Sequence, residues 1–498
     1  MTEQTTAGES RQYALRPAIP LLVGAAIYLF LLPLGSSLLN DADTYWHVAI
    51  GRWIVEHGAL PTGDPFSHTM RGAHWIAFEW LSQLAYAGAH ALGGWPAVAM
   101  LASVSYAIAF GLLARLLLRE LPPLPALIMV AVSFALAMPH MLARPHAFAF
   151  PILVIWAGTL VRTVDLGKAP PLALLPLMVL WANTHGSFTL GLALIGPVAF
   201  EAFWNARPPE RMRVAWLWLG FALLAIAAAC LTPYGPEMFL VTYRTLSLGE
   251  ALSIVVEWRP QDFGRLGAFE VSLLFGIGYA LHSGLTLPPL RILALLGLLH
   301  LALWQTRHAD LLALLGPLFL AAPLASWMAS RNVIQQQSTA ARAAVLAPSM
   351  IAAMILAVAA TSVVWMLMWG RNIAPHAQNT PSAAVAAASI AHAGPVLNDY
   401  RFGGYLDYIG IAPFIDGRAE VYGRDLMLRH HNAISLQDIP GFLRLLDQYR
   451  IQVTLLAPST PAIGLLDRLP EWRRVYADEI AVVHKRQPGA SAQPSPSQ

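Results

Sequence analysis

Residues 76–93, IAFEWLSQLAYAGAHALG, decide how the rest of the chain is threaded. The stretch is apolar enough to be considered as a membrane-spanning helix, but it contains Glu79, Gln83 and His90. Polar side chains of this kind are expensive inside a bilayer. If the stretch crosses the membrane, every later segment changes side. If it lies on the membrane surface, none does, and the loop charges distinguish the two cases.

The composition around this stretch is that of a membrane protein. Hydrophobic residues make up 57% and charged residues 12% of the 498 residues, whereas soluble domains carry about 25% charged residues. The 16 Trp and 14 Tyr suit the two membrane interfaces, where such rings gather. The net charge of +3 is too small to indicate a nucleic-acid partner. The single cysteine, Cys230, excludes an intrachain disulfide and a zinc–cysteine cluster.

About eleven other apolar runs approach the length needed to cross a ~30 Å hydrocarbon core. They lie near 18–36, 96–118, 123–139, 147–164, 170–184, 187–205, 213–232, 268–285, 290–305, 309–328 and 344–369. The first alone resembles a signal peptide, but the runs that follow favour an uncleaved span.

Positive charge favours eleven spans over twelve. With residues 76–93 on the surface and the N-terminus in the cytoplasm, the basic loops fall on the cytoplasmic side, as the positive-inside rule requires. Their residues are Arg11, Arg16, Arg115, Arg119, Arg162, Lys168, Arg207, Arg211, Arg213, Arg291, Arg331 and Arg342. A twelfth span would place most of them outside.

The sequence therefore predicts an α-helical multi-pass protein of a bacterial inner membrane with a small C-terminal α/β domain outside the cytoplasm. Residues 1–17 and 488–498 are predicted to be disordered tails, the first of them cytoplasmic. Residues 18–370 form the transmembrane domain, which includes a first loop at 37–95 with helices on the membrane surface. Residues 371–487 form the periplasmic domain, in which Pro413–Ile415 is one of the predicted strands.

The first loop opens with NDADTYWH, residues 40–47. Two carboxylates two residues apart, Asp41 and Asp43, have two chemical uses at the edge of a bilayer. One binds a divalent cation, Mg²⁺ or Mn²⁺, or acts as a general base, while the other orients an acceptor. The alternative is a polar helix cap flanked by interfacial aromatic rings.

Three later turns each contain a histidine and fall on the outer face in the eleven-span topology. They are ARPH at 143–146, WANTHG at 181–186 and QTRHAD at 305–310. Any one of them is more often an interfacial turn with an arginine that reaches toward the headgroups. Three on one face favour a binding site.

The C-terminal domain contains NDYRFGGYL at 398–406 and FIDGR at 414–418. A strand, a turn and a helix explain this pattern as well as an acceptor site does.

Taken in order, these motifs resemble the GT-C superfamily of membrane glycosyltransferases. Its relatives include oligosaccharyltransferase catalytic subunits, protein O-mannosyltransferases and aminoarabinose transferases. The resemblance is specific in the first loop and around 398–418, and thin in the middle spans. It implies transfer of a sugar from a polyprenyl-phosphate carrier, among membrane lipids, to a glycan, lipid or protein acceptor on the outer face.

The resemblance also implies roles for individual residues. Asp41 or Asp43 becomes the catalytic base, and the position of Asp43 beside Tyr45 and His47 favours Asp43. Arg307 and His308, with Arg144 and His146 in reserve, are the predicted ligands of the donor phosphate, since arginine forms bidentate pairs with phosphate. The remaining candidates, for the acceptor or other parts of the site, are His47, Glu79, Asn183, His185, Tyr400, Arg401, Asp416 and Arg418.

Two functions of other classes compete with an enzyme. One is a transporter or flippase for a lipid-linked solute, and the other is a non-catalytic assembly subunit of a cell-envelope glycan system. A transporter places ionisable groups near the bilayer midplane and often carries internal repeats. Here the ionisable groups lie at predicted helix ends on one face, and the sequence shows no repeat. This one-sided distribution favours an enzyme.

Overall fold

The computed structural model describes residues 18–264, 266–331 and 348–487. Both predicted tails, 1–17 and 488–498, lie outside them. The chain forms two compact units. Of the described residues, the membrane unit takes 18–35, 99–238, 255–264, 266–331 and 348–372. The α/β unit takes 36–98, 239–254 and 373–487. The first loop therefore belongs with the C-terminal segment, whereas the sequence placed it in the transmembrane domain.

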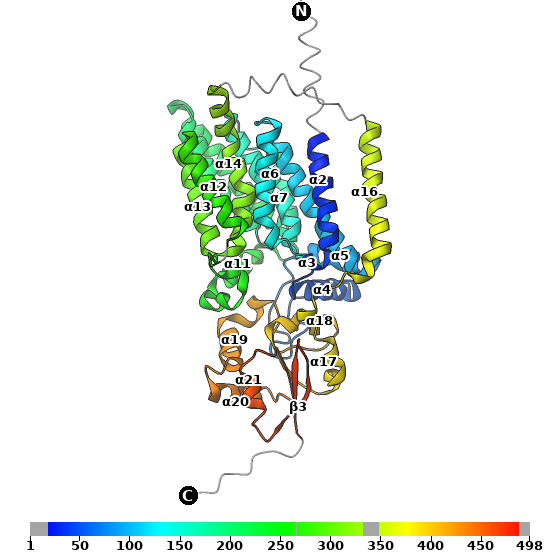
Figure 1. Ribbon diagram of the computed structural model, residues 1–498. Coiled ribbons are helices and arrows are strands. Elements are labelled where there is room, and N and C mark those ends of the chain that lie inside the picture. The colour runs from blue at the N-terminus through cyan, green and yellow to red at the C-terminus, as the bar shows by residue number, and fades with distance from the viewer. Residues whose placement is uncertain (1–17, 265, 332–347, 488–498) are drawn as a thin grey trace, which may run out of the picture. The chain divides into compact units, whose positions relative to one another are not determined.

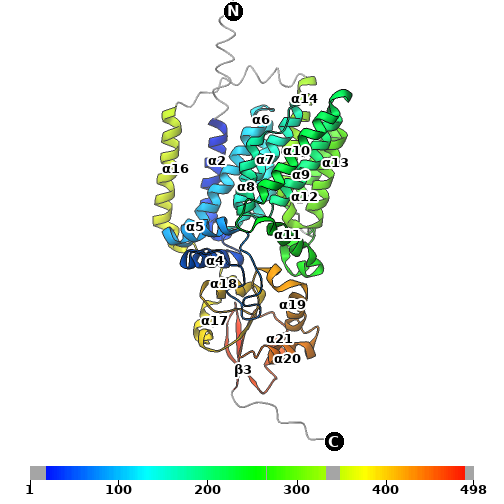
Figure 2. The same ribbon diagram turned by 180° about the vertical axis from the view of Figure 1, so that it is seen from behind.

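Helices occupy every apolar run of the membrane unit (Figures 1 and 2). They are α2 (Ala18–Leu31), the later part of α5 (Trp80–Leu117), α6 (Pro123–Ala137), α7 (His146–Asp165), α8 (Leu175–Thr184), α9 (Phe188–Asn205), α10 (Arg211–Ala229), α12 (Ala268–Ser283), α13 (Pro289–Trp304), α14 (Ala309–Ser330) and α16 (Pro348–Trp369). Among the described residues, 8 helices are long and apolar enough to cross a membrane, and two apolar helices are shorter. The protein is therefore a multi-pass membrane protein, and eleven spans stays a prediction.

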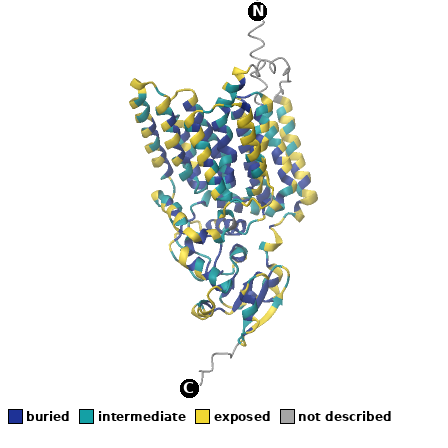
Figure 3. Ribbon diagram, turned by 60° about the vertical axis from the view of Figure 1, so that its left-hand side comes forward, coloured by how far each residue is buried: buried dark blue, intermediate teal, exposed yellow. Residues whose placement is uncertain are grey.

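Burial separates central from peripheral helices in this unit. In the most apolar 18-residue stretch of α7, 72% of the residues are buried. In the corresponding stretch of Ser349–Asn372, which contains most of α16, only 11% are buried. Figure 3 shows the corresponding exposed residues along the outer surfaces of the helices. Exposed apolar side chains such as Leu356 and Leu367 are what a lipid-facing helix surface requires.

The ambiguous stretch 76–93 contributes a separate helical segment. Helix α5 begins at Trp80 and loses helical geometry at Gly93 (φ −154°, ψ 19°) and Gly94 (φ 65°, ψ −155°). The left-handed φ of Gly94 is one that side chains with a Cβ rarely adopt. Residues 80–92 are thus set apart by this break from the apolar helix that follows, and their place on the membrane surface stays a prediction.

The α/β unit contains one sheet with the strand order β1-β2-β4-β3. Strands β1 (Val396–Asn398) and β2 (Val453–Leu456) are parallel, and β4 (Val482–Arg486) is antiparallel to β2 and to β3 (Trp472–Ala477). The unit's helices are α3 (Gly35–Leu38, from its second residue), α4 (Asp43–His57), the first part of α5, most of α11 (Met238–Ser247), α17 (Ser382–Ala387), α18 (Gly403–Tyr408), α19 (Ala419–Ile434), α20 (Ile439–Gln448) and α21 (Ala462–Leu466). The small α/β domain expected at the C-terminal end is present.

The strand predicted at Pro413–Ile415 is wrong. This segment is not part of the sheet, because side chains and the first loop satisfy its backbone groups. Asn398 accepts from the Phe414 N–H at 2.7 Å and donates to the Ile415 carbonyl at 2.7 Å. Thr69 donates to the Phe414 carbonyl at 2.6 Å. One asparagine thus replaces a neighbouring strand.

Helix α4 packs against the first part of α5 at Gly51. A Cβ atom at position 51 would lie 2.1 Å from the Gln83 carbonyl oxygen and 2.6 Å from the Ala87 Cβ. Backbone atoms cannot move aside as the end of a flexible side chain can. At Gly88, by contrast, a Cβ would meet no heavy atom within 4 Å.

We expect Gly51→Ala to lower the thermal midpoint of the detergent-solubilised protein, because an overpacked contact costs about 1–3 kcal/mol. Gly88→Ala is the matched control and should be neutral or stabilising by about 0.5–1 kcal/mol, since alanine favours a helix. Differential scanning fluorimetry measures both, and equal midpoints for the two variants would contradict this packing.

Candidate functional site

The Asp41–Asp43 pair lies at the start of α4. An Asp41 carboxylate oxygen accepts a hydrogen bond from the backbone N–H of Asp43 at 2.6 Å. Asp41 therefore satisfies one of the N–H groups that have no partner within a helix. Asp43 is 9% exposed, at the positive end of the helix dipole, where a negative charge is favoured. Asp41 fixes the start of the helix, and Asp43 is the enclosed acid.

Two further predicted residues, His47 and Glu79, lie near Asp43 within the α/β unit. His47 lies one turn after Asp43, on the same face of α4. Its Nδ1 is 3.9 Å from the Glu79 carboxylate, and both side chains are buried. Asp43 and His47 thus share a face of α4, and Glu79 comes close to His47 from a later part of the first loop. We call Asp43, His47 and Glu79 the acid site.

The acid site does not provide the ligand set of a cation site. Within the described ranges, no group of three or more His, Cys, Asp or Glu side chains is arranged to hold a metal ion. One oxygen of Asp41 already accepts the Asp43 N–H. Asp41 and Asp43 are therefore a poor fit to the Mg²⁺ or Mn²⁺ considered above, and we assign no catalytic step to a cation.

The two glycines of the 398–406 motif allow close packing in two directions. A Cβ at Gly403 would lie 2.2 Å from the Ile415 carbonyl oxygen, and a Cβ at Gly404 would lie 2.3 Å from the carbonyl oxygen of Ala42. Both glycines are therefore required for space. Through Gly404, the C-terminal motif contacts the residue that precedes Asp43.

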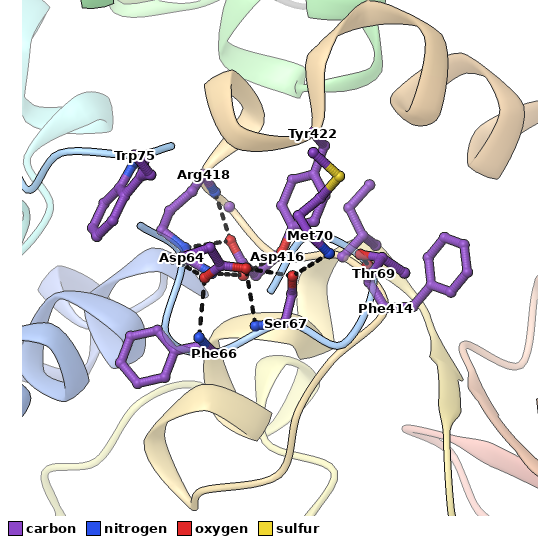
Figure 4. A network of polar contacts seen from close by, with 12 residues as sticks. Asp64, Phe66, Ser67, Thr69, Met70, Trp75, Phe414, Asp416, Arg418 and Tyr422 are labelled. Atoms are coloured by element: carbon purple, nitrogen blue, oxygen red, sulfur yellow. Dashed lines mark hydrogen bonds and ion pairs between the residues drawn. The ribbon is translucent and has the colours of Figure 1, made fainter. Parts of the chain in front are cut away.

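Asp416 and Arg418 lie at the centre of a buried arginine network (Figure 4). Arg418 donates from Nη1 to Asp64 at 2.7 Å and from Nη2 to Asp416 at 2.5 Å, and all three side chains are 0% exposed. The Tyr422 hydroxyl donates to Asp416 at 2.5 Å. Neither the Asp416 nor the Arg418 side chain is exposed, so neither can contact an acceptor. Instead, Arg418 links Asp64 of the first loop to Asp416 of the C-terminal segment.

Charge balance explains how this network tolerates its burial. Burial alone would lower the pKa of Arg418, but Asp416, Tyr422 and Asp64 raise it well above its ordinary value, so the guanidinium stays charged. Burial raises the pKa of the neighbouring Asp407 carboxyl well above its usual range, and repulsion from Asp416 raises it further. A raised pKa favours the neutral form of Asp407, which limits the number of buried negative charges around Arg418.

The other two C-terminal candidates, Tyr400 and Arg401, are partly exposed. The Tyr400 hydroxyl donates to the carbonyl of Gly417 at 3.2 Å. The Arg401 guanidinium lies 5.1 Å from the centre of the Phe402 ring and 3.9 Å from Asp399, and 36% of its side chain is exposed. Of the four predicted acceptor residues in this segment, these two are accessible.

In the membrane unit, one carboxylate connects two of the predicted phosphate ligands. Arg144 Nη1 donates to Glu257 at 2.8 Å, and Arg307 Nη1 lies 3.5 Å from the other oxygen of the same carboxylate. The Arg307 guanidinium also lies 4.3 Å from the centre of the Trp258 ring. We call Arg144, Glu257 and Arg307 the arginine–glutamate cluster. It joins two of the three predicted turns to a loop that had contributed no candidate.

Glu257 stays ionised in this cluster. Burial would raise the pKa of its carboxyl, but Arg144 and Arg307 oppose this effect and lower the pKa to about 2. The cluster therefore contains two guanidinium cations and one carboxylate anion.

The third turn approaches the same cluster through histidines. The ring centres of His146 and His185 are 6.4 Å apart, and the Tyr106 hydroxyl lies 3.0 Å from His146 Nε2. Burial lowers the pKa of His185 well below its ordinary value, and the nearby His146 and Arg307 lower it further. This lowered pKa favours the uncharged form of His185 near the two arginines.

The last two candidates, Asn183 and His308, differ in their hydrogen bonding. Asn183 donates from Nδ2 to the carbonyls of Val179 at 2.8 Å and Leu231 at 3.1 Å, so it ties α8 to the end of α10. His308 follows Arg307, and its Nδ1 is buried without a hydrogen-bond partner among the described residues. His308 thus keeps an unused polar atom next to the arginine–glutamate cluster.

Sequence reasoning did not select Glu257. It lies in the 231–267 segment between two apolar runs, where no repeated spacing or paired motif marks it. The adjoining Trp258-Arg259-Pro260 is a weak signal of an ordered loop rather than a linker. Only the fold brings this glutamate to Arg144 and Arg307, which lie 113 and 50 residues away along the chain.

Comparisons with known proteins establish the fold alone. No family model and no curated protein sequence matches the chain. The crystal structure of the Archaeoglobus fulgidus oligosaccharyltransferase tethered with an acceptor peptide is similar, with a TM-score of 0.53, 13% identity and coverage of 88% of this chain and 68% of that one. The archaeal oligosaccharyltransferase AglB from the same organism, in complex with an inhibitory peptide and a dolichol-phosphate, gives 0.51 at 13% identity over 89% and 69% of the two chains.

A third structure, ArnT from Cupriavidus metallidurans bound to undecaprenyl phosphate, covers 95% of this chain and 99% of its own at 14% identity, with a TM-score of 0.48. At these identities the likeness extends to the fold and no further. The chain therefore has the fold of the membrane oligosaccharyltransferases, as its resemblance to the GT-C superfamily predicted.

Proposed function

We propose that this protein is a glycosyltransferase that moves a sugar from a polyprenyl-phosphate carrier to an acceptor on the extracytoplasmic face of a bacterial inner membrane. The observation that carries the proposal is the arginine–glutamate cluster, in which two guanidiniums share one carboxylate. One solved structure of the same fold is a complex with dolichol-phosphate, a lipid anion of the class that such a cluster would bind.

Arg144 and Arg307 are the proposed ligands of the donor phosphate. Their guanidiniums approach the Glu257 carboxylate at 2.8 and 3.5 Å, so two positive charges gather at one place. Positive charge gathered in this way attracts an anion such as the phosphate of a lipid carrier. Guanidinium groups form paired, charge-assisted hydrogen bonds with phosphate oxygens. His308 is a further proposed donor, because its Nδ1 has no hydrogen-bond partner in the part of the chain that the structure describes.

Asp43 is the proposed general base. It takes the proton from the acceptor nucleophile, whose oxygen forms a bond to the anomeric carbon as the bond from that carbon to the phosphate oxygen breaks. The sugar is transferred with inversion, and the lipid phosphate leaves with the negative charge. Arginine charges on the leaving phosphate stabilise the transition state, in which this negative charge develops. Tyr400 and Arg401 are the proposed acceptor contacts, since both are partly exposed.

Asp43→Asn should lower transfer by about 10²–10⁴-fold, the usual contribution of a general base. Asp41→Asn should keep more activity than Asp43→Asn, because an amide oxygen can still accept the hydrogen bond from the N–H of residue 43. Purified protein is incubated with candidate polyprenyl-phospho-sugars, and the release of lipid phosphate is measured. Near-normal rates in both variants would refute the role of this pair.

The same assay distinguishes the competing functions. A transporter, a flippase or a non-catalytic subunit would bind the lipid without cleaving the bond between sugar and phosphate. Unchanged lipid across a full panel of carriers and acceptors would therefore favour those functions.

Arg307→Gln and Arg144→Gln should each weaken the binding of polyprenyl phosphate by about 10- to 100-fold, because a hydrogen bond to a charged group is worth about 1.5–3 kcal/mol. Arg424→Gln is the matched control, since Arg424 forms an exposed ion pair with Glu250 in the α/β unit and should leave the Kd unchanged. Microscale thermophoresis with the lipid in detergent measures the Kd. Equal effects in all three variants would indicate nonspecific charge.

A further inference from the structure

The carboxylate of Asp43 lies directly against the backbone of Gly417. A Cβ at position 417 would be 1.8 Å from Asp43 Oδ1, 2.7 Å from its Cγ and 2.8 Å from Nε1 of Trp46. Side chains do not approach a Cβ within 3.0 Å. The only side chain that fits at this position is therefore a hydrogen atom.

Backbone conformation does not explain this glycine. Gly410 and Gly423, which flank the same motif, have φ values of 78° and 67°, in the region that favours glycine. Gly417 is not among the glycines with positive φ. Position 417 requires glycine for space, and the group that takes this space is the side chain of the proposed base.

The backbone of Gly417 is held so that it cannot retreat. Its neighbours Asp416 and Arg418 are fully buried in the arginine network, and the Arg418 N–H donates to Asp416 at 2.8 Å. The Gly417 carbonyl accepts from the Ala419 N–H at 3.0 Å and from the Tyr400 hydroxyl at 3.2 Å. A rigid wall thus limits the rotamers open to Asp43.

Trp46 closes the same wall from α4. The indole is 4% exposed, and its Nε1 has no hydrogen-bond partner among the described residues. This N–H lies within a few ångströms of the Asp43 carboxylate, because both approach the Cβ position of residue 417. Packing and a nearby donor together restrict where the carboxylate oxygens lie.

We propose that Gly417 is a positioning residue that sets the direction of the Asp43 carboxylate, so that the C-terminal domain completes the catalytic centre. The inference rests on the proposed function, in which Asp43 is the base. It gives the 414–418 motif a role that is neither a simple turn nor a direct acceptor contact. Misplacing a catalytic group by about 1 Å can cost about 10²-fold in rate.

The first experiment is a double-mutant cycle on stability, which does not depend on activity. Gly417→Ala should lower the thermal midpoint of the full-length protein in detergent. The same substitution should lower it much less in an Asp43→Ala background, where the carboxylate no longer meets the new Cβ. Equal shifts in the two backgrounds would overturn the contact. If Gly417→Ala fails to fold alone, recovery of folded protein in the double variant shows the coupling.

The second experiment measures transfer. Gly417→Ala should lower kcat by about 100-fold while the Kd for polyprenyl phosphate changes by less than about threefold. The control is Gly464→Ala in α21, whose Cβ would meet only the end of Arg468 at 3.5 Å, and its kcat should match that of the wild type.

The outcomes separate the two ideas. Wild-type kcat in Gly417→Ala, with an inactive Asp43→Asn, would overturn the positioning role and leave the proposed function standing. Coupled stabilities together with an active Asp43→Asn would refute Asp43 as the base, and the positioning role with it, while leaving the contact intact.

Discussion

The α/β unit depends on one buried guanidinium. Arg418 bonds to Asp64 from the first loop and to Asp416 from the C-terminal segment, at a site without exposed surface. Breaking a buried ion pair by removing one partner typically costs about 3–5 kcal/mol, because a charge is left unpaired. The glycine contacts of the acid site follow from this arrangement, since Gly417 lies between the two members of the pair. The ion pairs of Arg418 hold the 414–418 motif in place, and this keeps Gly417 against the Asp43 carboxylate.

Charge balance distinguishes two kinds of buried ion cluster in the membrane unit. Arg291 pairs with both Asp165 and Glu201. Two carboxylates thus face one guanidinium, and they would repel a further anion. Arg291 also donates to the Phe319 carbonyl, which ties α13 to α14. In the arginine–glutamate cluster, by contrast, two guanidiniums contact one carboxylate. The first cluster holds helices together, and the second is the one that we propose to bind an anion.

Hydropathy and the local residue pattern predicted much of the fold. Helices occur at each predicted apolar run, and the break at Gly93–Gly94 separates the stretch that charge distribution had placed on the surface. The strand predicted at 413–415 failed because Asn398 satisfies its backbone groups, and nothing in the local pattern reveals such a long-range partner. The candidate site was predictable as residue types: Asp43, Arg144 and Arg307 were all selected. Glu257, Trp46 and Gly417 were missed.

The sequence by itself determined that this is a multi-pass membrane protein with a small α/β domain and acidic, basic and histidine-bearing turns, because hydropathy and charge are local properties. The tertiary structure alone decided which of these residues meet. Asp416 and Arg418 carry the same charges in an acceptor site as in a buried network, and only their burial distinguishes the two. Gly417 reads as a turn residue until the carboxylate of Asp43 is found against it, since a requirement for space is set by the neighbour that fills it.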